Sequence, residues 1–286
     1  MMDLHVHSHY SPDAESAPEA LIDAALRAGV RLLSITDHDG VDHIEPALRA
    51  AEGKALRLVP GLELTCSCPA FGLNEIHILA HFRTADGRPW CHPSLTELLE
   101  EITSAQAQNL TSLMRGLNIP AEALARAHRS LIESGQSTIG TRPALHLFKR
   151  CPPELRPFHW AEMKIKRDRI RAELREGGLW HPLPPVNRVL RVLTLVGASA
   201  TLAHPGRYDL NPSTLSDLID SIIAEGLTGL EAVYLPQPGS AGLFGPMAKA
   251  KACVITAGSD SHSAQAMLHP AYVSFIASTT DLHALI

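Results

Sequence analysis

Segments typical of buried strands alternate with segments typical of amphipathic helices in the first and last thirds of the chain. Ser16-Ala17-Pro18-Glu19 has the pattern of a helix capping box, and Gly29 is a plausible end for that helix. Further strands are predicted at residues 30–36, 58–63, 75–80, 198–203, 229–234 and 254–257. Because strands that alternate with helices form βα units, the pattern predicts an α/β fold with a largely parallel sheet.

The middle of the chain has helical periodicity and many charged residues instead. Breaks rich in proline and glycine interrupt it at 116–120, 151–153 and 181–185. We therefore expect residues 1–93 and 197–286 to close into a (β/α) catalytic barrel. Residues 94–196 are expected to form a mainly helical insertion that contributes to substrate binding.

Charge and cysteine content limit the partners and the location. A net charge of −5 and a pI near 6.3 disfavour binding to long nucleic acids or to an anionic membrane. No apolar stretch is long enough to span a bilayer, and the first residues lack the features of a signal peptide. Five cysteines in a chain of this length are expected to be reduced thiols of a cytoplasmic protein. The oligomeric state stays open.

Histidines and carboxylates lie on or just after the predicted strands. His5 and His7 alternate along an N-terminal strand, so both point to one face. Because the C-terminal strand ends of a barrel meet at one face, residues far apart in sequence are expected to converge there. Imidazole combined with carboxylate favours Mn, Fe or Zn over an all-oxygen calcium site. The other candidates at such positions are His38, Glu63, His77, His204, Asp260 and His262.

Six short motifs, in this order, resemble the PHP (polymerase and histidinol phosphatase) superfamily. They are Asp3-Leu4-His5-Val6-His7-Ser8, Thr36-Asp37-His38-Asp39, Gly61-Leu62-Glu63, Ile76-His77, Ala203-His204-Pro205-Gly206-Arg207-Tyr208 and Gly258-Ser259-Asp260-Ser261-His262. The resemblance spans nearly the whole chain. It is closest to stand-alone members that remove the 3′-phosphate of nucleoside 3′,5′-bisphosphates or trim RNA from the 5′ end. It implies a distorted (β/α)7 barrel with a trinuclear metal centre.

The resemblance also implies how the ligands divide among two to three divalent ions. His5, His7, Glu63 and Asp260 would hold one ion. Glu63, as a bridging carboxylate, would share a second ion with His77 and His204. The third ion would be held by Asp13, His38 and His262.

Two arginines are candidates for binding substrate phosphate: Arg207 lies in the motif after His204, and Arg142, in Thr141-Arg142-Pro143, resembles a second phosphate-binding arginine at the edge of the family's inserted region. Arg207 is the first candidate, since a guanidinium can take two phosphate oxygens at once, and Arg142 is the second. Close relatives often carry a histidine where this chain has Ala144, and His146 is a candidate to replace it. The loss of that histidine leaves the metal chemistry untouched but weakens the inference to a bisphosphate substrate.

These assignments predict hydrolysis of a small nucleotide at a phosphomonoester. The expected reaction removes the 3′-phosphate of a nucleoside 3′,5′-bisphosphate, giving a nucleoside 5′-monophosphate and phosphate. A metal-bridging hydroxide is expected to attack phosphorus in line, with no protein nucleophile. The alternatives are 5′→3′ exonuclease action on short oligonucleotides and hydrolysis of histidinol phosphate, which the motif around His204 disfavours. A non-catalytic, metal-stabilised binding module is the alternative from a different class.

Overall fold

The computed structural model describes residues 1–123, 125–126, 129, 151, 153–237 and 239–279. In these residues the strands form two sheets. The three-stranded sheet contains β1 (Met2–Val6), β2 (Leu32–Ile35) and β3 (Arg57–Leu58), all parallel. The five-stranded sheet has the order β4 (Gly61–Cys68), β5 (Leu73–His81), β6 (Ser199–Leu202), β7 (Gly229–Tyr234) and β8 (Val254–Gly258).

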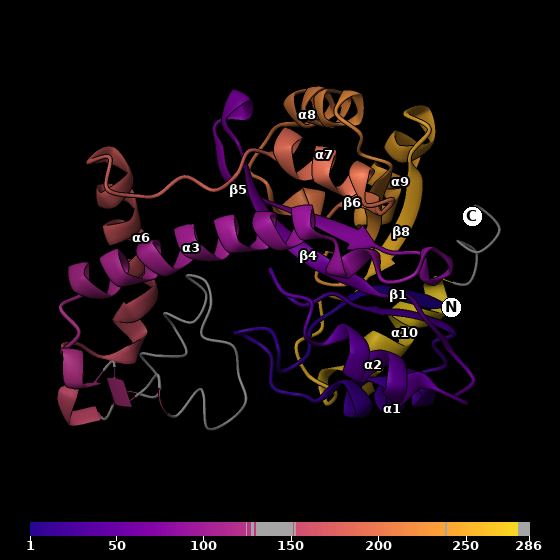
Figure 1. Cartoon of the computed structure of the whole chain (residues 1–286), viewed down its shortest axis with the longest axis horizontal. Coiled ribbons are helices and arrows are strands. Elements are labelled where there is room, and N and C mark those ends of the chain that lie inside the picture. Colours follow the sequence, from indigo (N-terminus) through magenta and orange to yellow (C-terminus); the bar gives the residue numbers. More distant parts are fainter. Residues whose placement is uncertain (124, 127–128, 130–150, 152, 238, 280–286) are drawn as a thin grey trace.

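The two sheets join at both edges and form a distorted barrel. On one side Val6 bridges to Ser261, and the amide of Asp260 donates to the carbonyl of His5 at 2.8 Å. On the other side His38 bridges to Glu63. Both junctions lie near the ends of strands, with Glu63 close to the start of β4, so closing the barrel also brings together the segments that carry the metal-ligand candidates (Figure 1).

The sheet is less parallel than the sequence predicts. Strand β5 runs antiparallel to both β4 and β6, whereas the other strand pairs are parallel. The physical reason is the short connection between β4 and β5, a single 3₁₀ turn (Pro69–Phe71) followed by Gly72 at φ 68°. A parallel pair needs a crossover of a dozen or more residues, and a connection this short allows only a hairpin.

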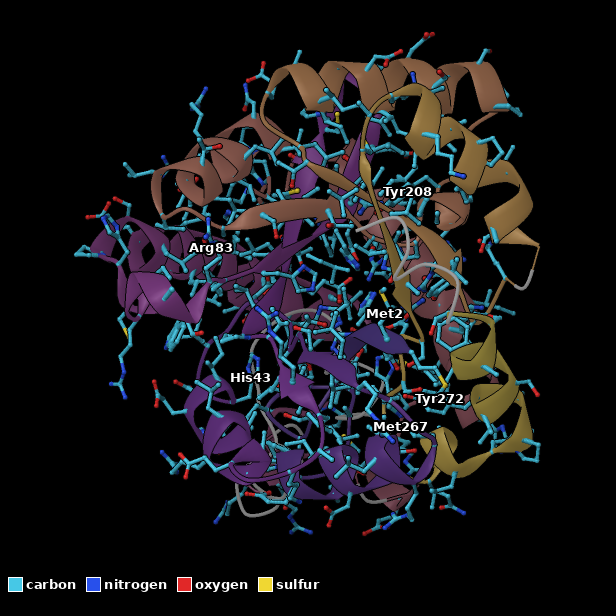
Figure 2. The ribbon with its side chains drawn as sticks, turned by 90° about the vertical axis from the view of Figure 1, so that its right-hand side faces the viewer. Met2, His43, Arg83, Tyr208, Met267 and Tyr272 are labelled. Carbon is cyan, nitrogen blue, oxygen red and sulfur yellow. The ribbon has the colours of Figure 1, made fainter. Side chains whose placement is uncertain are left out.

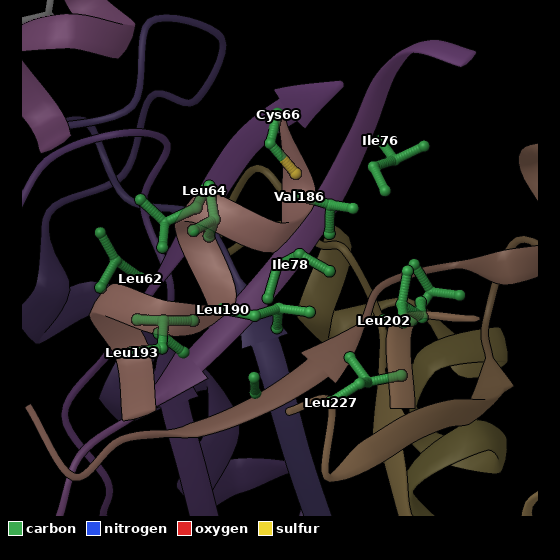
Figure 3. Close-up of a cluster of buried hydrophobic side chains, with 14 of the residues drawn as sticks. Leu62, Leu64, Cys66, Ile76, Ile78, Val186, Leu190, Leu193, Leu202 and Leu227 are labelled. Carbon is green, nitrogen blue, oxygen red and sulfur yellow. The ribbon is translucent and has the colours of Figure 1, made fainter. Parts of the chain in front are cut away.

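Helices on the outer faces complete two apolar cores. Helices α1 (Pro18–Arg27), α2 (Ile44–Ala51) and α10 (Pro270–Ser278) pack on the smaller sheet, where Met2, Met267 and Tyr272 are buried (Figure 2). Helices α7 (Val186–Leu195), α8 (Pro212–Ala224) and α9 (Ser240–Ala250) pack on the larger sheet. Figure 3 shows side chains of α7, such as Leu190, beside Leu64 and Ile78 of that sheet. Burial of these side chains supplies most of the hydrophobic stabilisation of the barrel.

The predicted capping box at the start of α1 is wrong. Ala17 is the N-cap and makes no side-chain hydrogen bond, while Pro18 occupies the first turn. The hydroxyl of Ser16 instead accepts a 2.9 Å hydrogen bond from the amide of Ala264. A long-range contact to the segment after β8 therefore replaces the local cap.

A helical arm extends from the barrel. Helix α3 (Pro93–Gly116) leads outward to α6 (Trp160–Glu176), which packs against its far end (Figure 1). A separate small core, which includes Leu113 and Met163, lies between them. Helix α7 falls within the predicted insertion but packs on the larger sheet of the barrel. The domain boundaries at residues 93 and 197 stay a prediction. No helix among the described residues is both long and apolar enough to cross a membrane.

Candidate metal centre

Glu63 lies at the centre of a buried cluster of histidines. Its Oε2 atom is 3.3 Å from Nε2 of His5 and 3.3 Å from Nε2 of His7. Its Oε1 atom is 2.7 Å from Nδ1 of His77 and 3.1 Å from Nε2 of His204. The side chain is 1% exposed. Oε2 also lies 2.9 Å from Nδ1 of His38. The two oxygens of one carboxylate therefore face different imidazoles, three at Oε2 and two at Oε1, which is the arrangement that a bridging ligand requires.

The first group of proposed ligands surrounds Oε2 of Glu63. The Nε2 atoms of His5 and His7 are 3.1 Å apart. Oδ1 of Asp260 lies 3.5 Å from Nε2 of His5 and 3.1 Å from Nε2 of His7. Four potential ligand atoms from β1, β4 and the segment after β8 thus face one point.

His38 and His262 form a further group on the other side of His7. The His7 ring lies 4.4 Å from the His38 ring and 4.5 Å from the His262 ring, measured between centroids. Oδ2 of Asp13 is 3.3 Å from Nε2 of His262 and 3.8 Å from Nε2 of His38. The potential ligand atoms of His7, His38 and His262 lie within 4.8 Å of one another, and Asp13 lies beside His262.

Two of the clustered side chains belong to residues with an unusual backbone. His204 has φ 31° and Asp260 has φ 52°, which is the left-handed region that residues other than glycine rarely adopt. Hydrogen bonds hold both turns, since the amide of His204 donates to Oε2 of Glu231 at 2.6 Å and the amide of Asp260 donates to the carbonyl of His5 at 2.8 Å. Such conformations occur mainly where the surrounding structure imposes them, often at functional sites.

Glu231 is a site residue that the sequence reasoning missed. Its Oε1 atom accepts a hydrogen bond from Nδ1 of His5 at 3.0 Å, and the carboxylate is completely buried. Gly258 leaves the space for it, because a Cβ atom there would lie 1.9 Å from Oε1 of Glu231. The available signal was an acidic residue inside the apolar strand Gly229–Tyr234, a position where a charge needs a buried partner.

Three more buried carboxylates position the loops around the cluster. Asp3 accepts from the amide and hydroxyl of Ser259 and from the hydroxyl of Tyr272, and Asp37 accepts from the amide of Ser8 at 2.5 Å. A third, Asp39, accepts from Thr65 and Gln106. Burial raises the pKa of Asp3 to about 6. These residues connect neighbouring strands and loops. Asp3 and Asp37 belong to the same sequence motifs as the metal-ligand candidates His5 and His38.

In the absence of a cation the carboxylates and histidines of the cluster shift the pKa values of one another. Burial acts to raise the pKa of Glu63, but the charges of His38, His77 and His5 outweigh it and hold that pKa well below its usual range. Burial likewise acts to lower the pKa of His7, but hydrogen bonds to Asp260 and Glu63 raise it to about 9. Protons on the histidines therefore balance the ionised carboxylates, and a bound cation can replace those protons.

The donor set fits divalent transition metals. Imidazole nitrogens and carboxylate oxygens are the ligands that Zn, Mn and Fe accept. The hydrogen bond from Nδ1 of His5 to Glu231 leaves Nε2 of His5 directed at Glu63 and Asp260, which is the orientation that a carboxylate imposes on a metal-binding histidine. His5, His7, Glu63 and Asp260 can hold one ion, and Glu63, His77 and His204 can hold another.

Arg207 lies at the open side of the cluster. Its Nη1 atom is 3.2 Å from Oδ2 of Asp260 and 3.4 Å from the hydroxyl of Tyr234, and the side chain is 51% exposed. The guanidinium is therefore within reach of both a bound ligand and the metal-ligand candidates. Arg142, Ala144 and His146 lie outside the described residues.

A cleft of about 340 Å³ opens beside His77, His204 and Arg207. Tyr208 also lines it, and the Tyr208 hydroxyl accepts a hydrogen bond from the amide of His77 at 3.0 Å. Two arginines of the helical arm, Arg171 and Arg175, complete the lining. The barrel and the arm thus share one concave surface next to the histidine cluster, in the size range of small-ligand sites.

This barrel with a buried histidine and carboxylate cluster defines a metal-dependent hydrolase. Residues 3–137 match the PHP domain model. The 5′-3′ exoribonuclease Rnm of Escherichia coli is 31% identical over 226 residues, which cover 76% of this chain and 69% of the relative. The chain belongs to the PHP family of metal-dependent phosphoesterases.

Other known proteins are similar over most of the chain. The 3′,5′-nucleoside bisphosphate phosphatase of Chromobacterium violaceum is 25% identical over 236 residues, which cover 80% of this chain and 75% of that protein. Among solved structures, a Chromobacterium violaceum amidohydrolase with bound sulfate and no metal has a TM-score of 0.67 at 21% identity, over 92% of this chain and 87% of that one. That likeness shows the shared fold.

Proposed function

We propose that this phosphoesterase removes the 3′-phosphate of a nucleoside 3′,5′-bisphosphate, giving a nucleoside 5′-monophosphate and phosphate. One observation carries the proposal: the buried Glu63 directs its two oxygens at two sets of histidines beside an arginine-lined cleft. The Chromobacterium violaceum relative is named for this reaction. A small cleft of net positive lining charge also suits a nucleotide better than a long polymer.

Two to three divalent ions, of Mn, Fe or Zn, are proposed to occupy the cluster, which becomes a trinuclear centre when all three are bound. The ligand sets are those implied by the family motifs, with Asp13, His38 and His262 at the third position. When bound, such ions neutralise phosphoryl oxygens and lower the pKa of water to about 7. Glu231 fixes the orientation of His5, and Arg207 is placed to bind phosphoryl oxygens next to Asp260.

No side chain of the protein is proposed to form a covalent intermediate with the substrate. Burial raises the pKa of the Cys66 thiol well above its usual range and also raises that of Cys68, the opposite of what a thiolate nucleophile needs. The five cysteines are all free, which supports the proposed cytoplasmic location.

The second candidate function is 5′→3′ exonuclease action on short oligonucleotides. The name and the 31% identity of the Escherichia coli relative favour it. Phosphate release from adenosine 3′,5′-bisphosphate and shortening of a 5′-phosphorylated trinucleotide should be compared on the manganese-loaded protein. We expect faster turnover of the bisphosphate, and preferential shortening of the trinucleotide would favour the exonuclease.

The variant Asp260→Ala tests whether the cluster carries the reaction. It should abolish hydrolysis and lower the metal content while the circular dichroism spectrum stays unchanged. Full residual turnover would refute the site. If the manganese-loaded wild-type protein released no phosphate from a broad panel of phosphoesters, and metal removal unfolded it, the chain would be a metal-stabilised binding module.

A further inference from the structure

Helix α6 directs two arginines into the cleft beside the metal centre. Arg171 and Arg175 are four residues apart and therefore lie on one face of the helix. Both line the cleft together with His77, His204 and Arg207. Neither arginine belongs to a motif of the barrel, and the family comparison assigns them no role.

The position of this helix is well defined by packing. A Cβ atom on Gly116 of α3 would lie 2.5 Å from Cγ2 of Ile170, so the two helices approach closely there. The side chain of Asn109 in α3 binds both the amide and the carbonyl of His181, at 2.7 and 2.9 Å. These contacts anchor the segment that contains Trp180 next to α6.

Trp180 orients both guanidinium groups. The Cζ atoms of Arg171 and Arg175 lie 5.6 and 5.3 Å from the centroid of the Trp180 ring. An arginine over an aromatic ring is held by cation–π attraction while its N–H groups stay available at the edge. The indole therefore fixes the direction of the two cations without neutralising them.

Other basic residues of α6 pair with neighbouring acids. Arg169 lies 2.7 Å from Glu173, and Lys166 lies 3.4 Å from Glu162, both at the exposed surface. The Nε atom of Arg175 is by contrast buried, with no hydrogen-bond partner among the described residues. Burial, and then the positive charge of Arg171, lower the pKa of the Arg175 guanidinium. Two like charges at this spacing repel each other, and the charge of Glu75 offsets this for Arg175 only in part.

The charge of the cleft is opposite to that of the whole chain. Three arginines line it against one acid, Glu75, whereas the chain carries a net charge of −5. Oε1 of Glu75 lies 3.5 Å from Nε2 of His77. The excess of positive charge is therefore a local feature, placed next to the proposed phosphoester-cleaving centre.

We propose that Arg171 and Arg175 form a second anion-binding subsite, which takes a phosphate group of the substrate other than the one that is hydrolysed. This inference rests on the proposed function. Its ligand class is a nucleotide with two phosphates. The second phosphate is either the 5′-phosphate of a bisphosphate or the next phosphodiester of a short oligonucleotide.

The variant Arg175→Gln tests the subsite, with Arg169→Gln as the matched control on the same helix. Each manganese-loaded protein is assayed with adenosine 3′,5′-bisphosphate and with adenosine 3′-monophosphate. The wild-type protein should prefer the bisphosphate in kcat/KM. Because a charge-assisted hydrogen bond to phosphate is lost, Arg175→Gln should reduce that preference about 10- to 100-fold, mainly through KM. Arg169→Gln should leave the preference unchanged.

The subsite is overturned if Arg175→Gln changes neither the preference for the bisphosphate nor the KM for a 5′-phosphorylated trinucleotide. A 5′-phosphorylated trinucleotide separates the two sources of the phosphate, since its KM should rise in Arg175→Gln only if the subsite binds the next phosphodiester. If the wild-type protein hydrolyses none of these compounds, the proposed function fails. Calorimetric titration of the metal-free protein still tests the subsite. The wild-type protein should bind the bisphosphate more tightly than the monophosphate, and Arg175→Gln should lose that difference.

Discussion

Oε1 of Glu231 accepts a hydrogen bond from Nδ1 of His5 at 3.0 Å, and both side chains are completely buried. Oε2 of the same carboxylate accepts from the amide of His204. One acidic residue of β7 thus orients a histidine of β1 and the turn after β6. Glu231 therefore positions two ligand candidates, His5 and His204, without being one of the predicted ligands itself.

Replacing Glu231 by glutamine should weaken metal binding about 10- to 100-fold, which is typical when a residue that orients a metal ligand is lost. The amide retains hydrogen bonding but removes the charge that favours the Nδ1–H form of His5. Competition with a chelator measures the affinity, and the exposed Glu225→Gln serves as the control. Unchanged affinity would show that the hydrogen bond from His5 to Glu231 is not needed to orient His5.

Glu63 should matter for more than one bound ion, because its two oxygens face separate groups of histidines. The variant Glu63→Ala should lower the number of bound ions more than His262→Ala, which removes a ligand from one group only. Metal per chain can be measured by elemental analysis after dialysis. Equal losses in the two variants would contradict the bridging role.

Gly258→Ala should disturb both stability and metal binding. The added Cβ would lie 1.9 Å from Oε1 of Glu231 and 2.4 Å from Cβ of His5, so both side chains must move. Overpacking of this kind typically costs about 1–3 kcal/mol. Gly245→Ala in α9 is the control, because its Cβ meets nothing within 4 Å. Urea denaturation should show destabilisation only for Gly258→Ala.

His81 should make the metal-free protein less stable in mild acid. Burial lowers its pKa from 6.5 to about 4, while Nε2 donates to the carbonyl of Leu4 at 3.0 Å. Between these values the unfolded chain binds a proton that the folded chain does not. The free energy of unfolding therefore falls as the pH drops from 6.5 to 4, by about 3 kcal/mol in total from this residue.

His81→Gln keeps a donor and removes the titration. The free energy of unfolding of this variant should depend less on pH than that of the wild type, when both are measured by urea denaturation at pH 4.5 and 6.5 with a chelator present. The exposed His181→Gln should behave like the wild type. An identical pH dependence in His81→Gln would show that His81 is not the responsible group.

Local patterns in the sequence predicted most strands. They also predicted that histidines and carboxylates would form the cluster around Glu63. The alternation of His5 and His7 on one strand predicts that both face the same side, and the structure has both buried with Nε2 atoms 3.1 Å apart. The predicted strand at 229–234 agrees with β7 at both ends. These features depend on side-chain periodicity over a few residues, which is visible in a single chain.

Other features depended on contacts between residues far apart in the chain. His5 and Glu231 are 226 positions apart, so their hydrogen bond exists only because β1, β7 and β8 meet in one barrel. The hydroxyl of Ser16, predicted to cap its own helix, binds a residue 248 positions away. Arg171 and Arg175 look like ordinary helix-surface residues until α6 is placed beside the cleft. The sequence by itself determined which chemical groups were available and which strands carry them. Only the tertiary structure decided which of those groups face one another, because burial and barrel closure act between distant segments.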